Sequence, residues 1–350
     1  MTTVGMMSDR GVTRYRGVLL EQAEGQASDP LAHGDTDMKL PAVGERFAID
    51  CKSDVADAVG SFVKAGIAPA TRRAYRSDID HFVAWGGTIP ATDAQLAAYV
   101  AAHAATLKVA TLVRRLAAIS VAHEALKAPN PVGSPLVRAT LRGIRRVHGV
   151  AQRQARPLLR EELFATLAAM RDRPKDVRDR ALLLLGFAGG FRRSELCALN
   201  HEDFHPVRQG LIVSIRRSKT DQEGTGRKVG IPLGRTAHCP VTAVERWIAT
   251  TTPGSRPLFR PIDRHGRISA ARLSGDAVSL IVRERVAAAG FEPSGYSGHS
   301  LRAGFATSAA AAGVQSWKIR QQTGHASDAM LMRYIRDGDL FVGNAAGSLL

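Results

Sequence analysis

A ten-residue break in an otherwise helical pattern, HGVAQRQARP at residues 148–157, divides this chain into two parts. Apolar residues recur at helical spacing from about residue 54 to 148 and return after residue 158, whereas the break is polar, basic and aperiodic. At 350 residues the chain is long enough to bury two hydrophobic cores. We therefore predict a mainly α (α+β) fold of two domains, joined by a linker at residues 149–157 that could follow a phosphate backbone.

The N-terminal part predicts a tail and a helical bundle. Residues 1–50 are rich in Gly, Asp, Met and Thr and lack periodicity, so we expect a mostly disordered tail there. Residues 51–148 predict a compact domain of four or five helices with arginines on its outside. Thr92 caps the start of one of these helices, and Ser134 before a first-turn proline caps another.

The C-terminal part predicts a mixed domain at residues 158–338. Two strand-like runs, 211–217 and 227–233, are separated by turn-forming residues and predict a small antiparallel sheet. Residues 339–350 form a tail with apolar side chains, which could dock on a neighbouring protomer. Around the strands we expect helices at 160–170, 177–189, 240–250, 274–289, 299–312, 315–322 and 327–336.

The charge of the chain indicates a polyanionic partner. There are 48 Lys and Arg against 32 Asp and Glu, a net charge of +16, which favours nucleic acid. Between Lys108 and Arg160 eleven residues are Lys or Arg, and Glu124 is the one acid. A solvated helix face normally mixes both signs, so we expect a DNA-binding surface. The arginines expected to take part are Arg114, Arg115, Arg138, Arg142, Arg145, Arg146, Arg153 and Arg156.

Other classes of protein find little support. Three cysteines without a C-x-x-C pair indicate neither a disulfide framework nor a thiolate zinc site. The N-terminus lacks a basic segment followed by an apolar one, and the most apolar run, residues 181–191, is too short to cross a bilayer. We expect a cytoplasmic bacterial protein without a membrane partner, associated with the nucleoid when it binds DNA.

One motif suggests a different chemistry. The sequence NHEDFHP at residues 200–206 contains the H-E-x-x-H spacing of zinc-dependent proteases. That motif binds zinc only on a helix, where both histidines share a face. Pro206 disfavours the helical conformation at His205, and no third ligand is identifiable by spacing. We therefore predict that these residues are a connector and that the protein has no metal site.

Polar residues recur where the apolar helices of the second domain break. Arg192 follows Gly-Gly in GGFRRSEL, with Glu195 three residues on, and Lys219 ends the first strand-like run in RRSKT. Further along are His299 and Arg302 on one helix face in SGHSLRAG, His325 after a glycine in QTGHAS, and Tyr334 near the end of a short helix in MLMRYIRDG.

In that order these motifs resemble the active-site motifs of the tyrosine recombinase (phage integrase) family, and the resemblance covers about 280 of the 350 residues. It implies a helical, SAM-like core-binding bundle, a linker and a catalytic domain that clamp double-stranded DNA. It also implies a monomer or dimer that forms a homo-tetramer at synapsis and exchanges strands through a Holliday junction. The catalytic positions it assigns are Arg192, Lys219, His299, Arg302, His325 and the nucleophile Tyr334.

The residue types suit this chemistry without metal, ATP or another cofactor. Two guanidiniums, on Arg192 and Arg302, can grip phosphate oxygens while negative charge develops in the transition state. His325 would donate a hydrogen bond to a further oxygen of the phosphate. A phenol leaves more readily than an alkyl alcohol, so a phosphotyrosine at Tyr334 can be attacked again by a 5′-hydroxyl.

Two proton transfers accompany the phosphoryl transfer. His299 would accept the phenolic proton, directly or by relay, and Lys219 would protonate the leaving 5′-oxygen. Lys228 on the second strand is the alternative to Lys219. Glu195 would support the site by orienting Arg192 or His299.

Two other functions are compatible with the same sequence. A topoisomerase-like nicking–closing enzyme would use the same residues as a monomer, and a DNA-binding protein with a relict site would not cleave at all. Tyr296 would be the next candidate for the nucleophile if Tyr334 were not the one.

Overall fold

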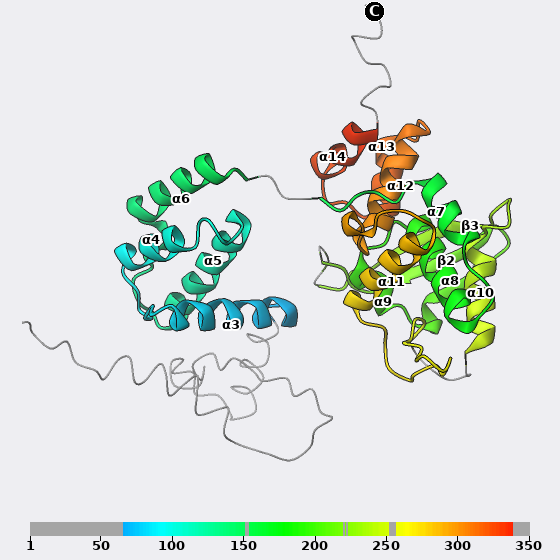
Figure 1. Cartoon of the computed structure of the whole chain (residues 1–350), viewed down its shortest axis with the longest axis horizontal. Coiled ribbons are helices and arrows are strands. Elements are labelled where there is room, and N and C mark those ends of the chain that lie inside the picture. The colour runs from blue at the N-terminus through cyan, green and yellow to red at the C-terminus, as the bar shows by residue number, and fades with distance from the viewer. Residues whose placement is uncertain (1–65, 151–153, 220, 222, 252–256, 339–350) are drawn as a thin grey trace, which may run out of the picture. The chain divides into compact units, whose positions relative to one another are not determined.

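The computed structural model describes residues 66–150, 154–219, 221, 223–251 and 257–338 (Figure 1). The predicted tails at residues 1–50 and 339–350 lie outside the described residues. The chain divides into two compact units, residues 1–152 and 153–350, each with its own core. None of the described helices is both long and apolar enough to cross a bilayer.

The N-terminal unit is a bundle of helices in its described part. They are α3 (Pro69–Ala84), α4 (Asp93–Ala102), α5 (Val109–Ala125), the short 3-10 helix η2 (Pro131–Gly133) and α6 (Pro135–His148). The predicted caps are confirmed, because the Thr92 hydroxyl accepts the backbone N–H of Gln95 and the Ser134 hydroxyl accepts that of Val137. Helix α3 packs on α5 and α4 on α6, around a core that includes Phe82.

The expectation that the arginines of this bundle lie on its outside fails for Arg115. Its side chain is buried, and its guanidinium donates to the Tyr99 hydroxyl at 3.0 Å and to the ring of His81 at 2.8 Å. Asp78, also buried, lies 3.6 Å from the same guanidinium. An arginine held among buried partners belongs to the core of the bundle rather than to a surface that meets DNA.

The C-terminal unit is mainly helical with one small sheet. Its helices are α7 (Arg160–Ala168), α8 (Pro174–Ala188), α9 (Arg193–Ala198), α10 (Pro240–Thr250), α11 (Gly275–Ala288), α12 (His299–Ala311), α13 (Ser316–Thr323) and α14 (Asp328–Gly338). Two 3-10 turns, η3 (His201–Asp203) and η4 (Pro293–Gly295), connect them. Helix α8 is buried along most of its length and packs on α10 and α12, which explains the apolar run in its sequence.

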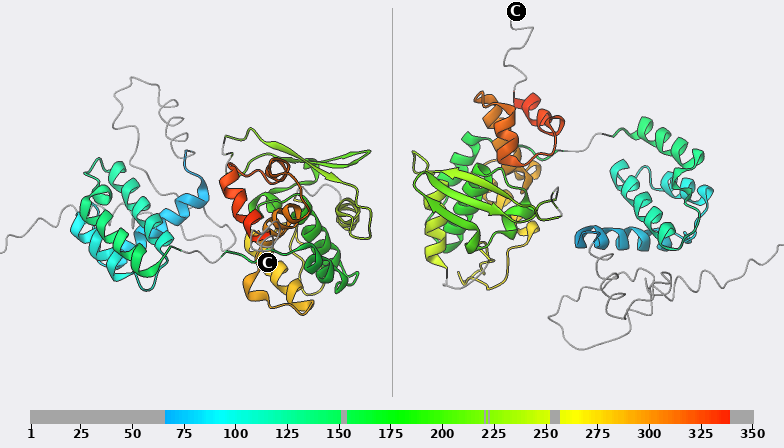
Figure 2. Two further views of the ribbon diagram at one scale, coloured as in Figure 1. Left: turned by 90° about the horizontal axis from the view of Figure 1, so that it is seen from above. Right: turned by 180° about the vertical axis from the view of Figure 1, so that it is seen from behind.

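The sheet has three antiparallel strands, β1 (Phe204–Val207), β2 (Gly210–Ile215) and β3 (Arg227–Pro232), in the order β1-β2-β3. Figure 2 shows it at one face of the unit, with helices behind it. The sequence predicted β2 and β3 but missed β1, whose four residues include a proline that an edge strand tolerates.

The structure also bears on the H-E-x-x-H motif. His201 lies in the 3-10 turn η3 and His205 in strand β1, so the two histidines share no helix. Part of the predicted connector is therefore a strand. Within the described residues, no group of three or more His, Cys, Asp or Glu side chains is arranged to hold a metal ion.

Candidate active site

Three guanidiniums converge on the C-terminal end of helix α13. The last carbonyls of a helix have no partner inside it and need donors from elsewhere. Gly324 ends α13 with a left-handed φ of +66°, which glycine adopts without strain. Here the Gln322 carbonyl accepts a hydrogen bond from Arg227, and the Thr323 carbonyl accepts one from Arg302. The Gly324 carbonyl accepts one from Arg192.

Arg302 is the most deeply buried of the three, with 1% of its surface exposed. It projects from α12, and its guanidinium also donates to the carbonyl of Gly190 at 2.9 Å. Burial, together with the charge of nearby Arg192, lowers the pKa of Arg302 to about 10. The guanidinium therefore keeps its charge near neutral pH, at the expense of its hydration.

Arg192 caps the start of α9, two residues after the turn at Gly189-Gly190. Its guanidinium donates to Glu195 at 2.6 Å and to the carbonyl of Gly324 at 2.8 Å. The carboxylate of Glu195, 2% exposed, also accepts the backbone N–H of Arg192 at 3.0 Å. Glu195 thus fixes Arg192 at both its backbone and its guanidinium.

Arg227, the third arginine, was not anticipated from the sequence. It opens strand β3 and donates to the second oxygen of Glu195 at 3.1 Å and to the Gln322 carbonyl at 2.8 Å. A signal was present, because side chains alternate along a strand and Arg227 is in phase with Val229 and Ile231, which are buried. A charged residue in phase with a buried face needs a partner there.

The hydroxyl of Tyr334 lies 2.6 Å from Nε2 of His299. Tyr334 is carried by α14, whose side chains pack against α12 and α13 through Leu331, while His299 is the first residue of α12. Burial lowers the pKa of His299 below its usual 6.5, and the charges of Arg302 and Arg192 lower it further. The imidazole is therefore neutral near pH 7 and able to accept the phenolic proton.

The ring of His325 also lies close to the tyrosine, with ring centroids 5.6 Å apart. It is buried, and burial followed by the charges of Arg302 and Arg192 lowers its pKa to about 3. The Thr323 hydroxyl donates to the Ile319 carbonyl at 2.7 Å and lies 2.7 Å from Nδ1 of His325, so it can accept an N–H from that nitrogen. In that arrangement a neutral imidazole presents Nε2 as an acceptor.

Lys219 is exposed on the loop between β2 and β3. The loop narrows to a tight turn in which Ser218 and Asp221 exchange two backbone hydrogen bonds of 3.2 Å. The Asp221 carboxylate then accepts the backbone N–H groups of Gly224, Thr225 and Gly226 at 2.7 to 3.1 Å. Asp221 therefore fixes the shape of the loop that carries the lysine.

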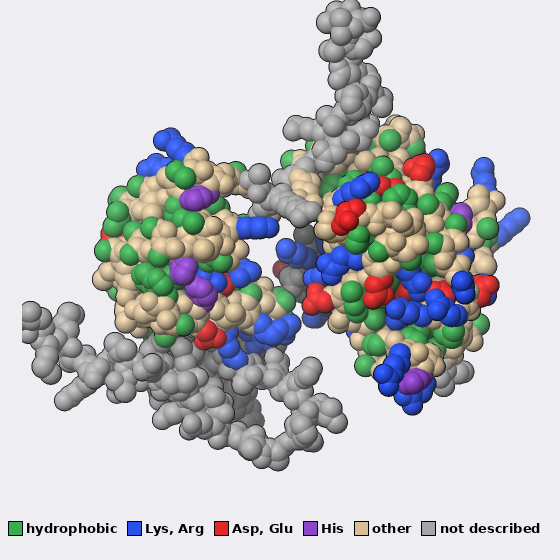
Figure 3. Space-filling view, viewed as in Figure 1, with side chains coloured by type: hydrophobic (Ala, Val, Ile, Leu, Met, Phe, Trp, Pro, Cys, Tyr) green, Lys and Arg blue, Asp and Glu red, His purple; other side chains and the backbone are tan. Residues whose placement is uncertain are grey.

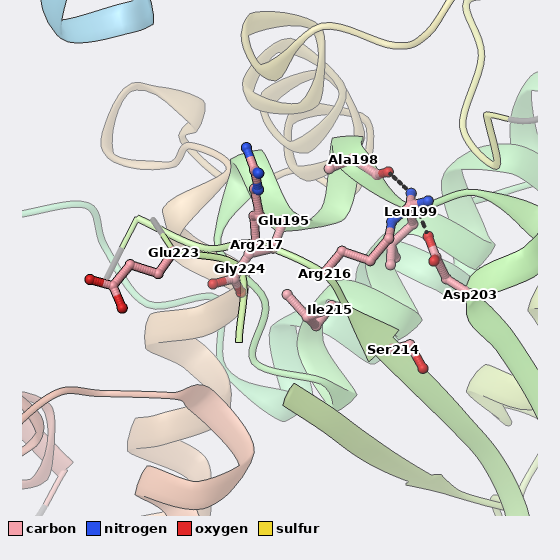
Figure 4. Close-up of a pocket in the computed structure, with 10 residues that line it drawn as sticks. All are labelled: Glu195, Ala198, Leu199, Asp203, Ser214, Ile215, Arg216, Arg217, Glu223 and Gly224. Atoms are coloured by element: carbon pink, nitrogen blue, oxygen red, sulfur yellow. Dashed lines mark hydrogen bonds and ion pairs between the residues drawn. The ribbon is translucent and has the colours of Figure 1, made fainter. Parts of the chain in front are cut away.

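A hollow of about 440 Å³ opens beside Glu195, between α9 and the base of this loop (Figure 4). Arg216 spans it, donating to the Ala198 carbonyl at 3.4 Å and to Asp203 at 3.0 Å. Both acids of the H-E-x-x-H segment pair with Arg216, because Glu202 also lies 2.9 Å from its guanidinium. Through these contacts Arg216 connects the base of the loop to the end of α9.

The structure places the arginines expected to bind DNA in different surroundings. Arg138, Arg142, Arg145 and Arg146 are exposed on α6, and Figure 3 shows Lys and Arg side chains on the surface of both units. Arg114 is half exposed and forms two hydrogen bonds of 2.8 Å with Asp78. Arg115 is buried, as described above, and Arg153 lies outside the described residues.

Arg156 has a structural setting at the end of the predicted linker. It pairs with Glu162 at 2.5 Å and lies over the ring of Tyr296, and its backbone N–H donates to Gly295. Tyr296 itself is buried, and its hydroxyl donates to Glu162 at 3.0 Å. Burial and the Glu162 carboxylate raise the pKa of Tyr296 to about 12. This second tyrosine is therefore neither accessible nor activated.

Comparison with known proteins gives one consistent result. Residues 157–339 match the model of the phage integrase family. The chain is 40% identical over 286 residues to an integrase/recombinase xerD homolog of Selenomonas ruminantium, covering 79% of this chain and 84% of that protein. It is 27% identical over 256 residues to recombinase cre of Escherichia phage P1, covering 68% and 73%.

Solved structures of recombinases and integrases have a fold similar to that of this chain. A XerH site-specific recombinase in a post-cleavage complex with its difH substrate superposes with a TM-score of 0.60 at 17% identity, covering 85% of each chain. A lambda integrase tetramer bound to a Holliday junction gives a TM-score of 0.55 at 18% identity, covering 95% of this chain and 88% of that one. At such identities the similarity concerns the fold.

Proposed function

The chain belongs to the phage integrase family of tyrosine recombinases, and we propose that it recombines DNA at specific sites through a covalent bond between Tyr334 and a 3′-phosphate. The observation that carries the assignment of the nucleophile is the 2.6 Å distance between the Tyr334 hydroxyl and Nε2 of His299, within a group of guanidiniums. A phenol beside a neutral imidazole and a cationic clamp is equipped to attack a phosphodiester.

The reaction then proceeds as a transesterification. The Tyr334 oxygen attacks the phosphorus and gives its proton to His299, and the bond between phosphorus and the 5′-oxygen breaks. Lys219 supplies a proton to that oxygen, which leaves as a free 5′-hydroxyl. A 5′-hydroxyl from a second duplex reverses the step, so the number of phosphodiester bonds is conserved without ATP.

Arg192 and Arg302 bind the non-bridging oxygens of the phosphate and offset the charge that develops on them. Their present partners are neutral carbonyls and one carboxylate, so the site as a whole keeps positive charge for an anion. His325 contributes a donor at Nε2 either by gaining a proton beside the negative phosphate or after the Thr323 hydroxyl turns toward Nδ1. Glu195 orients Arg192.

Lys219 is preferred to Lys228 as the general acid. Lys228 follows Arg227 on β3, so its exposed side chain points to the opposite face of the strand from Glu195. Lys219 lies instead on the loop beyond the strands, where a long side chain can reach a DNA strand laid over the site.

Double-stranded DNA is the substrate, and a homo-tetramer carries out the exchange. Structures with the same fold include lambda integrase as a dimer on a core site and as a tetramer at a Holliday junction. The exposed arginines Arg138, Arg142, Arg145 and Arg146 on α6, with Arg114, supply the DNA-binding surface of the N-terminal unit. We also propose that the protein acts in the bacterial cytoplasm, on DNA of the nucleoid.

A nicked suicide substrate tests the nucleophile. After cleavage, the short DNA fragment that carries the new 5′-hydroxyl diffuses away and cannot religate. The covalent adduct between the protein and the remaining strand then persists and resists SDS. We expect an adduct with the wild-type protein and none with Tyr334→Phe or Arg302→Ala. Tyr296→Phe makes the same chemical change at a buried tyrosine and serves as the matched control, which should still form the adduct. An adduct with Tyr334→Phe would show that the nucleophile has been misassigned.

Neither alternative function is favoured. A nicking–closing enzyme would act as a monomer, whereas the similar proteins of known activity are recombinases and integrases. A relict DNA-binding protein would have lost part of the site, whereas Arg192, His299, Arg302, His325 and Tyr334 are in contact with the same helix end or with one another. Junction intermediates from a two-site substrate would separate recombination from simple nicking and closing.

A further inference from the structure

Arg227 joins three parts of the C-terminal unit at one point. From the start of β3 its guanidinium donates to Glu195 at 3.1 Å, to the Gln322 carbonyl at 2.8 Å and to the Thr323 carbonyl at 3.4 Å. In the sheet it pairs with Ile215, the last residue of β2, so it stands where the Lys219 loop leaves the strands. Its side chain is 22% exposed, which leaves little surface for direct contact with DNA.

The charge balance indicates that stability alone does not account for this arginine. Arg192, Arg227 and Arg302 bring three positive charges to the end of α13, and the carboxylate that contacts two of them, Glu195, removes one. Burial and the proximity of Arg192 lower the pKa of Arg227, and its buried Nε has no hydrogen-bond partner among the described residues. A third, largely desolvated cation with an unmet donor costs folding free energy.

The packing around Arg227 fixes its position closely. A Cβ added to Gly324 would lie 2.9 Å from Nε of Arg227 and 3.1 Å from Cζ, so the guanidinium rests directly against the backbone at that residue. The carbonyl of the same Gly324 accepts the hydrogen bond from Arg192. Arg227 therefore supports both groups that hold Arg192, namely the carboxylate of Glu195 and the end of α13.

We propose, on the basis of the function proposed above, that Arg227 is a positioning residue for strand cleavage: it holds Glu195 and the last turn of α13 in the geometry that points Arg192 at the phosphate. It acts through Arg192 and does not itself touch the DNA. Loss of Arg227 removes one hydrogen bond from Glu195 and one from the Gln322 carbonyl, so the carboxylate and the helix end that hold Arg192 can shift together with it.

Single-turnover cleavage of the suicide substrate tests this role in the full-length protein. Arg227→Gln removes the charge at similar size and should slow adduct formation about 100-fold, the effect of a misplacement of about 1 Å at a reacting group. Arg227→Lys keeps the charge but cannot bridge Glu195 and the carbonyls, so it should restore only part of the rate. Arg208→Gln, an exposed arginine at the β1–β2 turn, makes the same substitution elsewhere in the sheet and should cleave normally.

Two further measurements separate positioning from a structural role or a DNA contact. Arg227→Gln leaves Glu195 with both of its hydrogen bonds from Arg192, so the variant should stay folded at the assay temperature, and its affinity for the uncleaved site should be unchanged. A substrate with sulfur in place of the leaving 5′-oxygen needs no general acid, so it should rescue Lys219→Ala and leave Arg227→Gln slow.

The outcomes are distinct. If the wild-type protein itself forms no adduct, the proposed function fails rather than the role of Arg227. If the wild type cleaves, three results for Arg227→Gln would contradict the positioning role. The variant could cleave as fast as the wild type, or the sulfur substrate could restore its rate. Its rate could also fall only in proportion to a loss of DNA affinity or thermal stability.

Discussion

In the proposed mechanism, the protonation of a single imidazole, that of His299, controls whether Tyr334 can be activated. His299 can accept the phenolic proton at 2.6 Å only while Nε2 carries a lone pair. Burial and two neighbouring guanidiniums lower the pKa of this histidine, so the neutral form is present at neutral pH and persists into weakly acidic solution. As pH falls through the lowered pKa, the base is lost.

The pH dependence of cleavage follows with a definite sign. We expect the second-order rate of adduct formation, which reports groups of the free enzyme, to fall with decreasing pH along an acid limb that lies below pH 6.5. His325, whose pKa is about 3, also titrates below pH 6.5, so a variant of His299 assigns the limb. His299→Gln should lower the rate and abolish the limb. An acid limb centred above pH 6.5 in the wild type would contradict the assignment.

At the scale of single residues, the sequence predicted most members of the candidate active site. It did not predict the positions of side chains whose partners are distant in sequence. The order of the motifs identified Arg192, His299, Arg302, His325 and Tyr334, which the structure brings together at the end of α13 and around the tyrosine. Arg227 was missed because its partners, Glu195 and α13, are far from it in sequence. Arg115 was placed on the surface because a run of basic residues does not reveal that Asp78, His81 and Tyr99 enclose one of them.

Among the elements, the loop between β2 and β3 depends on one carboxylate. Asp221 accepts three backbone N–H groups on the far side of the turn from Lys219, and these bonds hold its pKa below the usual value. The carboxylate is therefore ionised at neutral pH, and the loop keeps its shape. Lys219 can act as a general acid only if this loop presents it to the leaving oxygen.

Substituting Asp221 should impair the general acid and leave the clamp intact. We expect Asp221→Ala to slow cleavage of the normal substrate about 100-fold, the lower end of the range for general acid catalysis, and the substrate with a sulfur leaving group to restore the rate. Asp263→Ala removes a similar turn-forming carboxylate from another loop and should change neither rate. Failure of the sulfur substrate to rescue Asp221→Ala would assign Asp221 a broader role.

The helices were largely predictable because their signals are local. Thr92, Ser134 and the prolines at first turns lie within three residues of the backbone groups they cap or begin, so the chain itself shows where a helix starts. Strand β1 carries no such signal. Its residues alternate only weakly in burial, and its pairing with β2 depends on a turn at residues 208–209 that composition alone did not reveal.

At the scale of the whole molecule, a net charge of +16 makes DNA binding sensitive to salt. Each phosphate neutralised by the protein contributes roughly 0.9 to the slope of log affinity against log salt concentration. Replacing Arg138, Arg142, Arg145 and Arg146 by Gln should reduce that slope by up to about 3.6, if all four contact phosphates. Titration of labelled DNA at several salt concentrations measures it.

Arg115→Gln provides the matched control, because it makes the same substitution in the same unit at a buried position. It should lower the thermal stability of the protein, since Asp78 and Tyr99 lose a partner, and leave the salt slope of the folded protein unchanged. A reduced slope for Arg115→Gln, or an unchanged slope for the four substitutions on α6, would place the DNA-binding surface elsewhere.

The convergence of three guanidiniums on the end of α13 also limits how this chain can evolve. Each residue added to a helix turns everything beyond it by about 100°. An insertion or deletion within α13, between Ser316 and Thr323, would therefore swing the carbonyls of the last turn away from all three arginines at once, even if the helix itself still formed. Exchanges at Trp317 or Lys318, which face solvent, leave those carbonyls where they are. Homologues should thus vary at the exposed positions of this short helix while keeping its length.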